Sequence, residues 1–431
     1  MNRRDFVESV AAGLALGSHS RAANDKVGVG IVGVGGRGRY LITHLSRRED
    51  INLLAICDPD QARTQQGLEV VAPGKPKPRT YVDLRKLYEN KEVDVVFIAA
   101  TNHWHSLATI WACQAGKDVY VEKPASYNVF EGQRMVEAAR RHNRVVQVGM
   151  QRRSLPHKKR AIELLRQGYI GKVYMARGLC YKQRRSMGHK PETQAPATLN
   201  WDLFLGPAPM RPYTENRQRG WHYLWDTGNA DIGNQGIHEV DVARWGLNKS
   251  VNPKTAYCGG GKYIWDDDQK TPNVQAAIWD YGDCLMTFEV RQLITGPESE
   301  MEQRRGSDNF VGNLFYGSDG YMVTEDSNFK TFRGPKREPG ESGRVVEDKE
   351  HDETYPHVNN FFDCVRKRRP QDLAADVQEG VRSAELVHMA NISYRTGRKL
   401  VLEAGATRFV GDVEANRLLT RNPYRKPYLV L

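Results

Sequence analysis

Apolar stretches and helical patterns alternate through the first third of the chain. Short runs that are apolar along their whole length are separated by segments with apolar residues at helical spacing, such as Leu41, Ile42 and Leu45. Strands of this kind, separated by helices, are typical of a parallel sheet that is covered on both faces. The pattern predicts a doubly wound α/β domain over residues 24–150, with strands at residues 27–32, 51–58, 93–100, 118–122 and 145–149.

The pattern changes after Met150. A helix and a strand are followed by a long polar stretch rich in proline and tryptophan, at residues 182–226. Further strand-like segments are separated by hairpin-like gaps, which favours antiparallel neighbours. We therefore expect an α+β domain with a largely antiparallel open sheet over residues 151–400. Its strands are predicted at residues 172–178, 274–280, 284–290, 308–315 and 321–324, with a charged surface loop at 333–353 and a C-terminal tail at 401–431.

The first apolar strand runs directly into a glycine-rich turn of the form G-x-G-x-x-G. Such a turn between a strand and a helix brings backbone N–H groups to a pyrophosphate. The second strand ends at Asp58, 20 positions past Gly38, where a carboxylate meets the ribose hydroxyls of a bound dinucleotide. The acid favours NAD, although Arg37 and Arg39 leave NADP open. The candidate cofactor residues of this region are Gly33, Gly35, Gly36, Arg37, Gly38 and Asp58.

Polar residues follow two later strands of the same domain. Because ligands of such sheets bind at the carboxyl ends of the strands, Thr101, Asn102, His105 and the Glu122-Lys123 pair are further cofactor candidates. Lys123 is also a candidate acid/base group beside the nicotinamide. The alternatives are a loop that caps a helix for the first group and an ordinary surface lysine for the second.

A third candidate segment covers residues 225–241. If its second half is helical, Asn234, His238 and Asp241 share one face, and histidine is a natural proton acceptor near neutral pH. Trp221 and Trp225 offer flat apolar surfaces for a sugar ring, although packing beneath a helix is an equally ordinary role for a tryptophan. No cluster of cysteine and histidine has the spacing of a zinc site, so no metal is expected.

Composition and charge narrow the range of functions. The formal net charge of the 431 residues is +11, but the basic runs are short and lack interleaved aromatics, so no nucleic-acid partner is expected. The N-terminus has twin arginines, a short apolar run and small residues, which resembles a twin-arginine export signal over residues 1–23. We expect an exported or periplasmic protein without a membrane anchor. The alternative is a basic N-terminus with no signal function.

Taken together, these motifs resemble those of the Gfo/Idh/MocA oxidoreductases. The resemblance rests on the glycine turn, Cys57-Asp58-Pro59, residues 102–105, Glu122-Lys123-Pro124 and the Gly-x-x-Gly-x-His-x-x-Asp run at 233–241. It implies that Lys123 bridges cofactor and substrate and that His238 takes a hydroxyl proton. It also implies that the subunits form a homo-oligomer. The family often has Asp where this chain has Asn234, which removes a charge that would raise the basicity of His238.

The leading hypothesis from the sequence is an NAD(P)-dependent oxidoreductase that acts on a sugar, cyclitol or related polyol. Lys123 and His238 are its catalytic candidates, and Asn234, Asp241, Trp221 and Trp225 are its substrate-binding candidates. One alternative is a glycoside hydrolase or lyase that oxidises C3 transiently with tightly bound NAD. A second alternative is a cofactor-binding protein without turnover.

Overall fold

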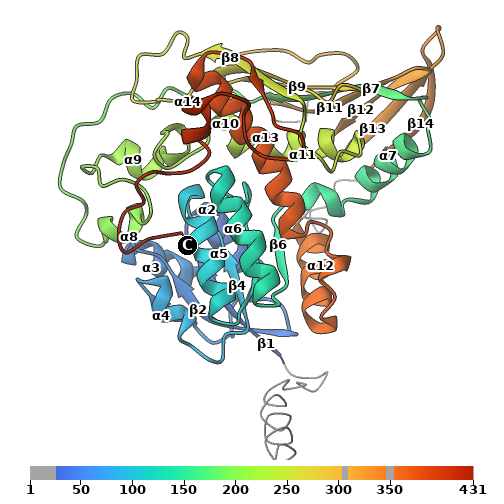
Figure 1. Ribbon diagram of the computed structural model, residues 1–431. Helices are drawn as coiled ribbons and strands as arrows, with labels where there is room; N and C mark the ends of the chain where they lie inside the picture. Colours follow the sequence, from blue (N-terminus) through green and yellow to red (C-terminus); the bar gives the residue numbers. More distant parts are fainter. Residues whose placement is uncertain (1–25, 303–308, 346–353, 431) are drawn as a thin grey trace, which may run out of the picture.

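The structure is a computed structural model that describes residues 26–302, 309–345 and 354–430. The export signal expected at residues 1–23 lies outside the described residues. Figure 1 shows a smaller sheet flanked by helices, a larger sheet across the top of the molecule, and the long helix α13 (Val377–Thr396) running between them.

The smaller sheet has six strands in the order β3-β2-β1-β4-β5-β6, and each neighbouring pair is parallel. This is the strand order of a dinucleotide-binding Rossmann sheet, whose order reverses beside β1. The predicted doubly wound domain is therefore confirmed. Its strands are β1 (Val27–Val32), β2 (Ile51–Cys57), β3 (Arg79–Tyr81), β4 (Val95–Ile98), β5 (Asp118–Val121) and β6 (Val146–Val148).

Helices cover both faces of this sheet. Val95 and Phe97 face one side, and Val96 and Ile98 face the other, as the alternation of a strand requires. The first side is covered by α2 (Gly36–Leu45), α3 (Gln61–Glu69) and α12 (Thr354–Lys367), and the second by α4 (Leu84–Tyr88), α5 (Asn102–Gln114) and α6 (Val129–Arg141). The chain thus returns to the first domain late, and the ring of Phe361 in α12 lies 5.7 Å from that of Phe97.

The larger sheet has nine strands in the order β14-β13-β12-β11-β7-β10-β9-β8-β15. Only β7 and β10 are parallel neighbours, which confirms a largely antiparallel sheet. Its strands are β7 (Val173–Tyr181), β8 (Thr255–Gly261), β9 (Val274–Asp280), β10 (Leu285–Arg291), β11 (Phe310–Gly317), β12 (Gly320–Glu325), β13 (Asn328–Arg333), β14 (Glu338–Arg344) and β15 (Leu400–Val401).

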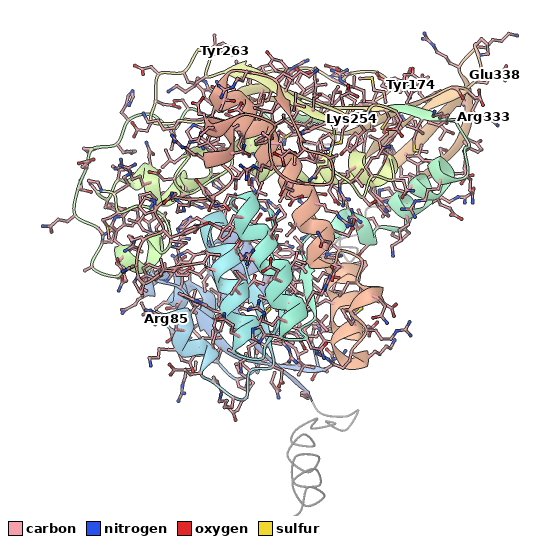
Figure 2. The ribbon with its side chains drawn as sticks, viewed as in Figure 1. Arg85, Tyr174, Lys254, Tyr263, Arg333 and Glu338 are labelled. Atoms are coloured by element: carbon pink, nitrogen blue, oxygen red, sulfur yellow. The ribbon has the colours of Figure 1, made fainter. Side chains whose placement is uncertain are left out.

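Part of the segment expected to be a surface loop, residues 333–353, is instead a strand of this sheet. Arg333 pairs with Glu338, so β13 and β14 form a hairpin, and Figure 2 shows both residues at the far end of the sheet. A charged strand at a sheet edge has an exposed face on both sides, and for that reason it lacks the apolar alternation by which strands are recognised. Residues 346–353 lie outside the described part of the chain.

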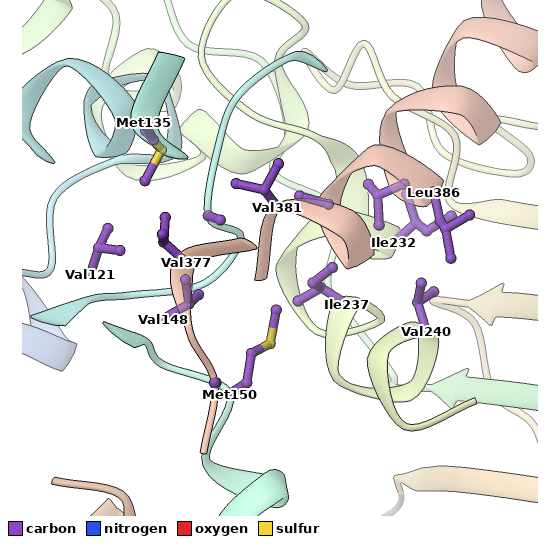
Figure 3. Packing of buried hydrophobic residues seen from close by; sticks show 14 of the residues in the cluster. Val121, Met135, Val148, Met150, Ile232, Ile237, Val240, Val377, Val381 and Leu386 are labelled. Carbon is purple, nitrogen blue, oxygen red and sulfur yellow. The ribbon is translucent and has the colours of Figure 1, made fainter. Parts of the chain in front are cut away.

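A single apolar core joins the two domains. Figure 3 shows Val377 and Val381 of α13 packed toward Val148 of the smaller sheet, while Leu386 of the same helix lies near Ile232 and Val240. Helix α13 therefore fixes the position of one domain relative to the other. The helices between the domains and on the inner side of the larger sheet are α7 (Pro156–Arg166), α10 (Ala230–Asn234), α11 (Ile237–Gly246) and α13.

The polar stretch at residues 182–226 and the C-terminal tail contain only short elements. The tail packs on its own chain, where the buried Tyr428 donates a hydrogen bond of 2.7 Å to Asp202 of the polar stretch. The polar stretch contains α8 (Trp201–Leu205), α9 (Glu215–Arg219) and the 3₁₀ turn η2 (Trp221–Tyr223), and the tail contains α14 (Val413–Arg417). Two further 3₁₀ turns, η1 (Gln151–Ser154) and η3 (Pro370–Asp372), lie outside both segments.

Candidate active site

A cavity of about 590 Å³ lies where the carboxyl ends of β1, β2, β4 and β5 meet the second domain. The glycine turn and Asp58 line one part of it, Lys123 and the α10–α11 segment line another, and the stretch at 182–226 contributes Phe204, Gln218 and Trp221. A parallel sheet whose order reverses beside β1 is expected to bind ligands at this position.

The glycine turn has the geometry that close approach to a phosphate requires. Gly33 has a φ of +89°, and a Cβ there would lie 2.5 Å from the backbone of Ala99. A Cβ on Gly38 would lie 1.9 Å from the carbonyl oxygen of Gly33, so α2 packs directly on the turn. Helix α2 begins at Gly36, and Gly35, Gly36 and Arg37 line the cavity, so the helix N-terminus lies where an anion can bind.

Asp58 lies buried at the end of β2, in the wall of the same cavity. Its two carboxylate oxygens accept hydrogen bonds from the backbone N–H groups of Val34, at 2.7 Å, and Asp60, at 2.9 Å. Burial raises the pKa of Asp58, against the opposing effect of Arg63. Arg63 lines the cavity, whereas Arg39 does not line it and donates a hydrogen bond to Gln66.

Thr101, Asn102 and His105 line the cavity at the start of α5. Both ring nitrogens of His105 lie within hydrogen-bond distance of backbone carbonyls, at 3.0 Å from Ala100 and 2.7 Å from Pro124. His105 thus ties the end of β4 to the segment that follows Lys123. Asn102 donates to the side chain of Asn229, at 3.1 Å, and so links this helix to the second domain.

Lys123 stands at the end of β5, before a cis peptide bond to Pro124. Its Nζ donates a hydrogen bond of 2.7 Å to the backbone carbonyl of Asn234. Burial lowers the pKa of Lys123, and the neighbouring Glu122 carboxylate opposes this by favouring the charged form. Glu122 is in turn held by Arg37, at 2.6 Å, so the glycine turn and the lysine are connected through one ion pair.

His238 and Asn234 line the cavity on the side where Lys123 bonds the second domain. Burial lowers the pKa of His238 well below its ordinary value, and the nearby cations Arg152, Lys123, Arg37 and Lys182 lower it further. The imidazole is therefore neutral near pH 7 and can accept a proton. Asn234 donates to the carboxylate of Asp231, at 3.0 Å, and Asp231 is paired with Arg184.

Two of the predicted substrate-binding residues, Asp241 and Trp225, do not line the cavity. The helix expected through residues 234–241 is interrupted, because α10 ends at Asn234 and α11 begins at Ile237. Asp241 therefore points into a buried ion pair with Arg153, with both N···O distances at 2.8 Å. Trp225 lines a different cavity, beside Arg395. We reassign both residues to structural positions.

Sequence reasoning missed some residues that line the cavity. His222 stacks on Trp221 with ring centroids 4.0 Å apart, and burial lowers its pKa to about 4. It lies in the irregular stretch that has no periodic pattern, and its only signal was its position between two aromatic residues. Gln151 and Gln235 also line the cavity. In the described part of the chain, no three His, Cys, Asp or Glu side chains are grouped as metal ligands.

A six-stranded parallel sheet with a glycine turn at its cleft, joined to a second domain that closes the cleft, defines a two-domain dinucleotide-binding protein. The chain belongs to the Gfo/Idh/MocA oxidoreductase family. The model for the family's NAD-binding Rossmann fold matches residues 27–150, and the model for its C-terminal alpha/beta domain matches residues 162–256 and 322–430. Among the described residues, none of the helices is long and apolar enough to cross a membrane.

Curated relatives and solved structures agree with this family. The inositol 2-dehydrogenase of Salmonella typhimurium is 26% identical over 230 residues, which are 53% of this chain and 56% of that protein. The chain thus spans about half the length of these relatives. A glycosyl hydrolase family 109 protein of Shewanella sp. is 33% identical over 120 residues, 27% of this chain and 26% of that protein. The WlbA dehydrogenase of Bordetella pertussis, solved with NADH and UDP-GlcNAcA, has a TM-score of 0.63 at 19% identity, covering 88% of this chain and 99% of that one.

Proposed function

We propose that the protein is an NAD(P)-dependent oxidoreductase that moves a hydride between the nicotinamide and a hydroxyl carbon of a sugar, cyclitol or related polyol. The observation that carries the proposal is that Lys123 and His238 line the same cavity as the glycine turn and Asp58. The family assignment and the inositol 2-dehydrogenase relative support it. Asp58 favours NAD over NADP, because its carboxylate repels a 2′-phosphate.

The residues of the cavity suit alcohol oxidation. The dinucleotide, when bound, supplies the hydride acceptor. His238 is neutral and takes the proton from the substrate hydroxyl as the carbon is oxidised to a carbonyl. Lys123 orients the hydroxyl oxygen and, as an ammonium, stabilises the negative charge that develops there. The Glu122 carboxylate favours the charged form of Lys123 and so opposes the effect of burial on its pKa, whereas Arg37 acts in the same direction as burial.

The test is NADH formation by the purified chain with a panel of inositols, aldoses and sugar derivatives. We expect at least one compound to be oxidised, and we expect Lys123→Ala and His238→Ala to abolish turnover while NAD affinity, measured calorimetrically, stays within a few-fold. No NADH with any member of the panel would count against an oxidoreductase. Unchanged turnover in both variants would overturn the roles of Lys123 and His238, and stoichiometric NAD binding without turnover of any compound would favour a protein that only binds the cofactor.

The glycoside hydrolase alternative is not favoured, because the family 109 match covers about a quarter of each chain. The same assay separates it from an oxidoreductase. A hydrolase that returns its hydride releases the aglycone of a nitrophenyl glycoside without net reduction of NAD. A dehydrogenase reduces NAD and leaves the glycosidic bond intact.

Export by the twin-arginine route also remains a proposal, supported by Arg3 and Arg4 followed by a short apolar run. Replacing both arginines by lysine should retain the full-length chain in the cytoplasm, as cell fractionation would show.

We further propose that the protein forms a homo-oligomer. Tyr257, Ile278 and Val401 are each more than 40% exposed on β8, β9 and β15 of the larger sheet. Light scattering would report the mass in solution.

A further inference from the structure

Two lysine ammonium groups donate hydrogen bonds to consecutive residues of the cavity wall. Lys123 Nζ donates to the backbone carbonyl of Asn234, at 2.7 Å. Lys182 Nζ, at the end of β7, donates to the side-chain oxygen of Gln235, at 2.9 Å. Asn234 and Gln235 both line the cavity, on the side of His238. Both lysines are half-buried, and both of these acceptors are neutral.

The other cations near His238 and Asn234 are paired with carboxylates. Arg37 is paired with Glu122, at 2.6 Å, and Arg184 is paired with Asp231, at 3.0 Å. Arg152 is paired with Glu239 and with Asp326. Within the described residues, neither Lys123 nor Lys182 forms an ion pair with a carboxylate. The part of the cavity around Lys123 and His238 therefore carries a net positive charge, which Glu122 and Asp231 compensate only in part.

Asn234 is a position in the cavity wall whose side chain carries no negative charge. Its side chain is an amide, it lies at the turn between α10 and α11, and its Nδ2 already donates to Asp231 at 3.0 Å. An aspartate at the same position would add a negative charge on the residue whose backbone carbonyl accepts from Lys123 and which precedes the residue that accepts from Lys182. A half-buried cation without a counter-ion is costly, whereas a charge-assisted hydrogen bond to an anion is about twice as strong as a neutral one.

We propose that the substrate carries an anionic group and that Lys182, together with Lys123, binds it, so that Lys182 and Asn234 determine the preference for anionic over neutral sugars. This inference rests on the proposed function, since it names the substrate class of the same cavity. The anion replaces the neutral acceptor Gln235 at Lys182, and Lys123 remains able to orient the hydroxyl. A carboxylate, a sulfate ester and a phosphate ester share the required chemistry.

The test compares matched pairs of ligands that differ in one anionic group. The affinity of NADH-loaded protein is measured calorimetrically for glucuronate and glucose, galacturonate and galactose, glucose 6-sulfate, and glucose 6-phosphate. We expect one anionic ligand to bind at least tenfold more tightly than its neutral partner, with the difference shrinking as salt rises. The carboxylate, sulfate and phosphate arms distinguish which anion the cavity accepts.

Variants assign this preference to particular residues. Lys182→Met should weaken the anionic ligand by ~10- to 100-fold, the value of one hydrogen bond to a charged group, and should leave the neutral ligand unchanged. Lys182→Arg keeps the charge and should keep the preference within a few-fold. Asn234→Asp should reverse it toward the neutral ligand. The matched control is Lys254→Met, because Lys254 is an exposed lysine remote from the cavity (Figure 2).

The outcomes separate this inference from the proposed function. Oxidation of neutral polyols, with no anionic ligand binding more tightly, overturns only the anionic preference. Tight anion binding that Lys182→Met abolishes, without NADH formation from any compound, supports the binding inference and overturns the oxidoreductase. An anion preference that Lys182→Met and Lys182→Arg both leave intact overturns the assignment to Lys182.

Discussion

The substitution Asp241→Asn tests whether this carboxylate serves the fold or the substrate. Asp241 is buried, and its oxygens accept two hydrogen bonds of 2.8 Å from Arg153 and one of 2.6 Å from Ser383. Arg244 lies 3.7 Å away. Asparagine keeps the shape of the side chain but removes its charge, so the guanidinium of Arg153 is left in a buried environment with less compensation.

The charged groups around Asp241 determine how much unfolding free energy the substitution removes. Removing one partner of a buried ion pair costs about 3–5 kcal/mol. Glu379 moderates the loss, because its carboxylate lies 3.4 Å from Arg153 and 2.7 Å from Arg244, so we expect about 3 kcal/mol. With about 2.1 cal/mol/K of unfolding entropy per residue over the 431-residue chain, that loss lowers Tm by roughly 3 °C.

The pH dependence of the stability difference provides a second test of this prediction. Burial alone would raise the pKa of Asp241, but Arg153 holds it below the ordinary value. A carboxylate whose folded pKa is depressed stabilises the protein above its unfolded pKa, and this stabilisation is lost as pH falls through the folded pKa. The stability difference between wild type and Asp241→Asn should therefore be full at pH 7 and should shrink below about pH 4.

Urea and thermal unfolding of both proteins measure this difference, and steady-state kinetics at a temperature where both are folded measure the site. We expect lower stability with kcat/KM unchanged within a few-fold. A variant as stable as the wild type whose kcat/KM falls by orders of magnitude would refute the structural role, and it would return Asp241 to the substrate site.

Three further predictions concern the cavity. Glu122→Gln removes the carboxylate that keeps Lys123 charged, so the alkaline limb of the kcat/KM–pH profile should move to lower pH. Asp58→Ala should reduce the preference for NAD over NADP by about tenfold or more, measured as the ratio of their calorimetric affinities. Tyr428→Phe removes the 2.7 Å hydrogen bond to Asp202 beside α8, and NADH release followed by stopped-flow fluorescence should accelerate a few-fold; an unchanged rate would mean that the tail does not restrain this edge of the cavity.

The Rossmann domain could be predicted because its information is local. Each strand is an uninterrupted apolar run, each helix repeats at its own period, and the turn needs glycine at Gly33 and Gly38 for steric reasons visible at those positions alone. The candidates in this domain lie at strand ends, and the structure brings Asp58, Thr101 and Lys123 to one cavity. Position along the sequence was sufficient there because parallel strands end at a common edge.

The stretch at residues 182–226 could not be placed from its own pattern. It is fixed by contacts that are distant in sequence, such as the hydrogen bonds of Asp60 with Thr198 at 2.9 Å and Gln218 at 3.4 Å. No periodicity encodes such contacts. Asp241 was misplaced for a related reason: the spacing argument assumed one continuous helix, and the break before Ile237 rotates the residues that follow it.

The two ends of the cavity come from different parts of the chain. Asp58 and Asp83, at the adenosine end, belong to the Rossmann domain, whose geometry is set by a cofactor common to the family. Lys182 and Gln235, at the reacting end, belong to the second domain. Lys123 joins them, since it ends a Rossmann strand and bonds Asn234 of the second domain. Apart from Lys123, the residues that we propose to contact the substrate therefore lie within residues 182–238, in a different domain from those at the cofactor end.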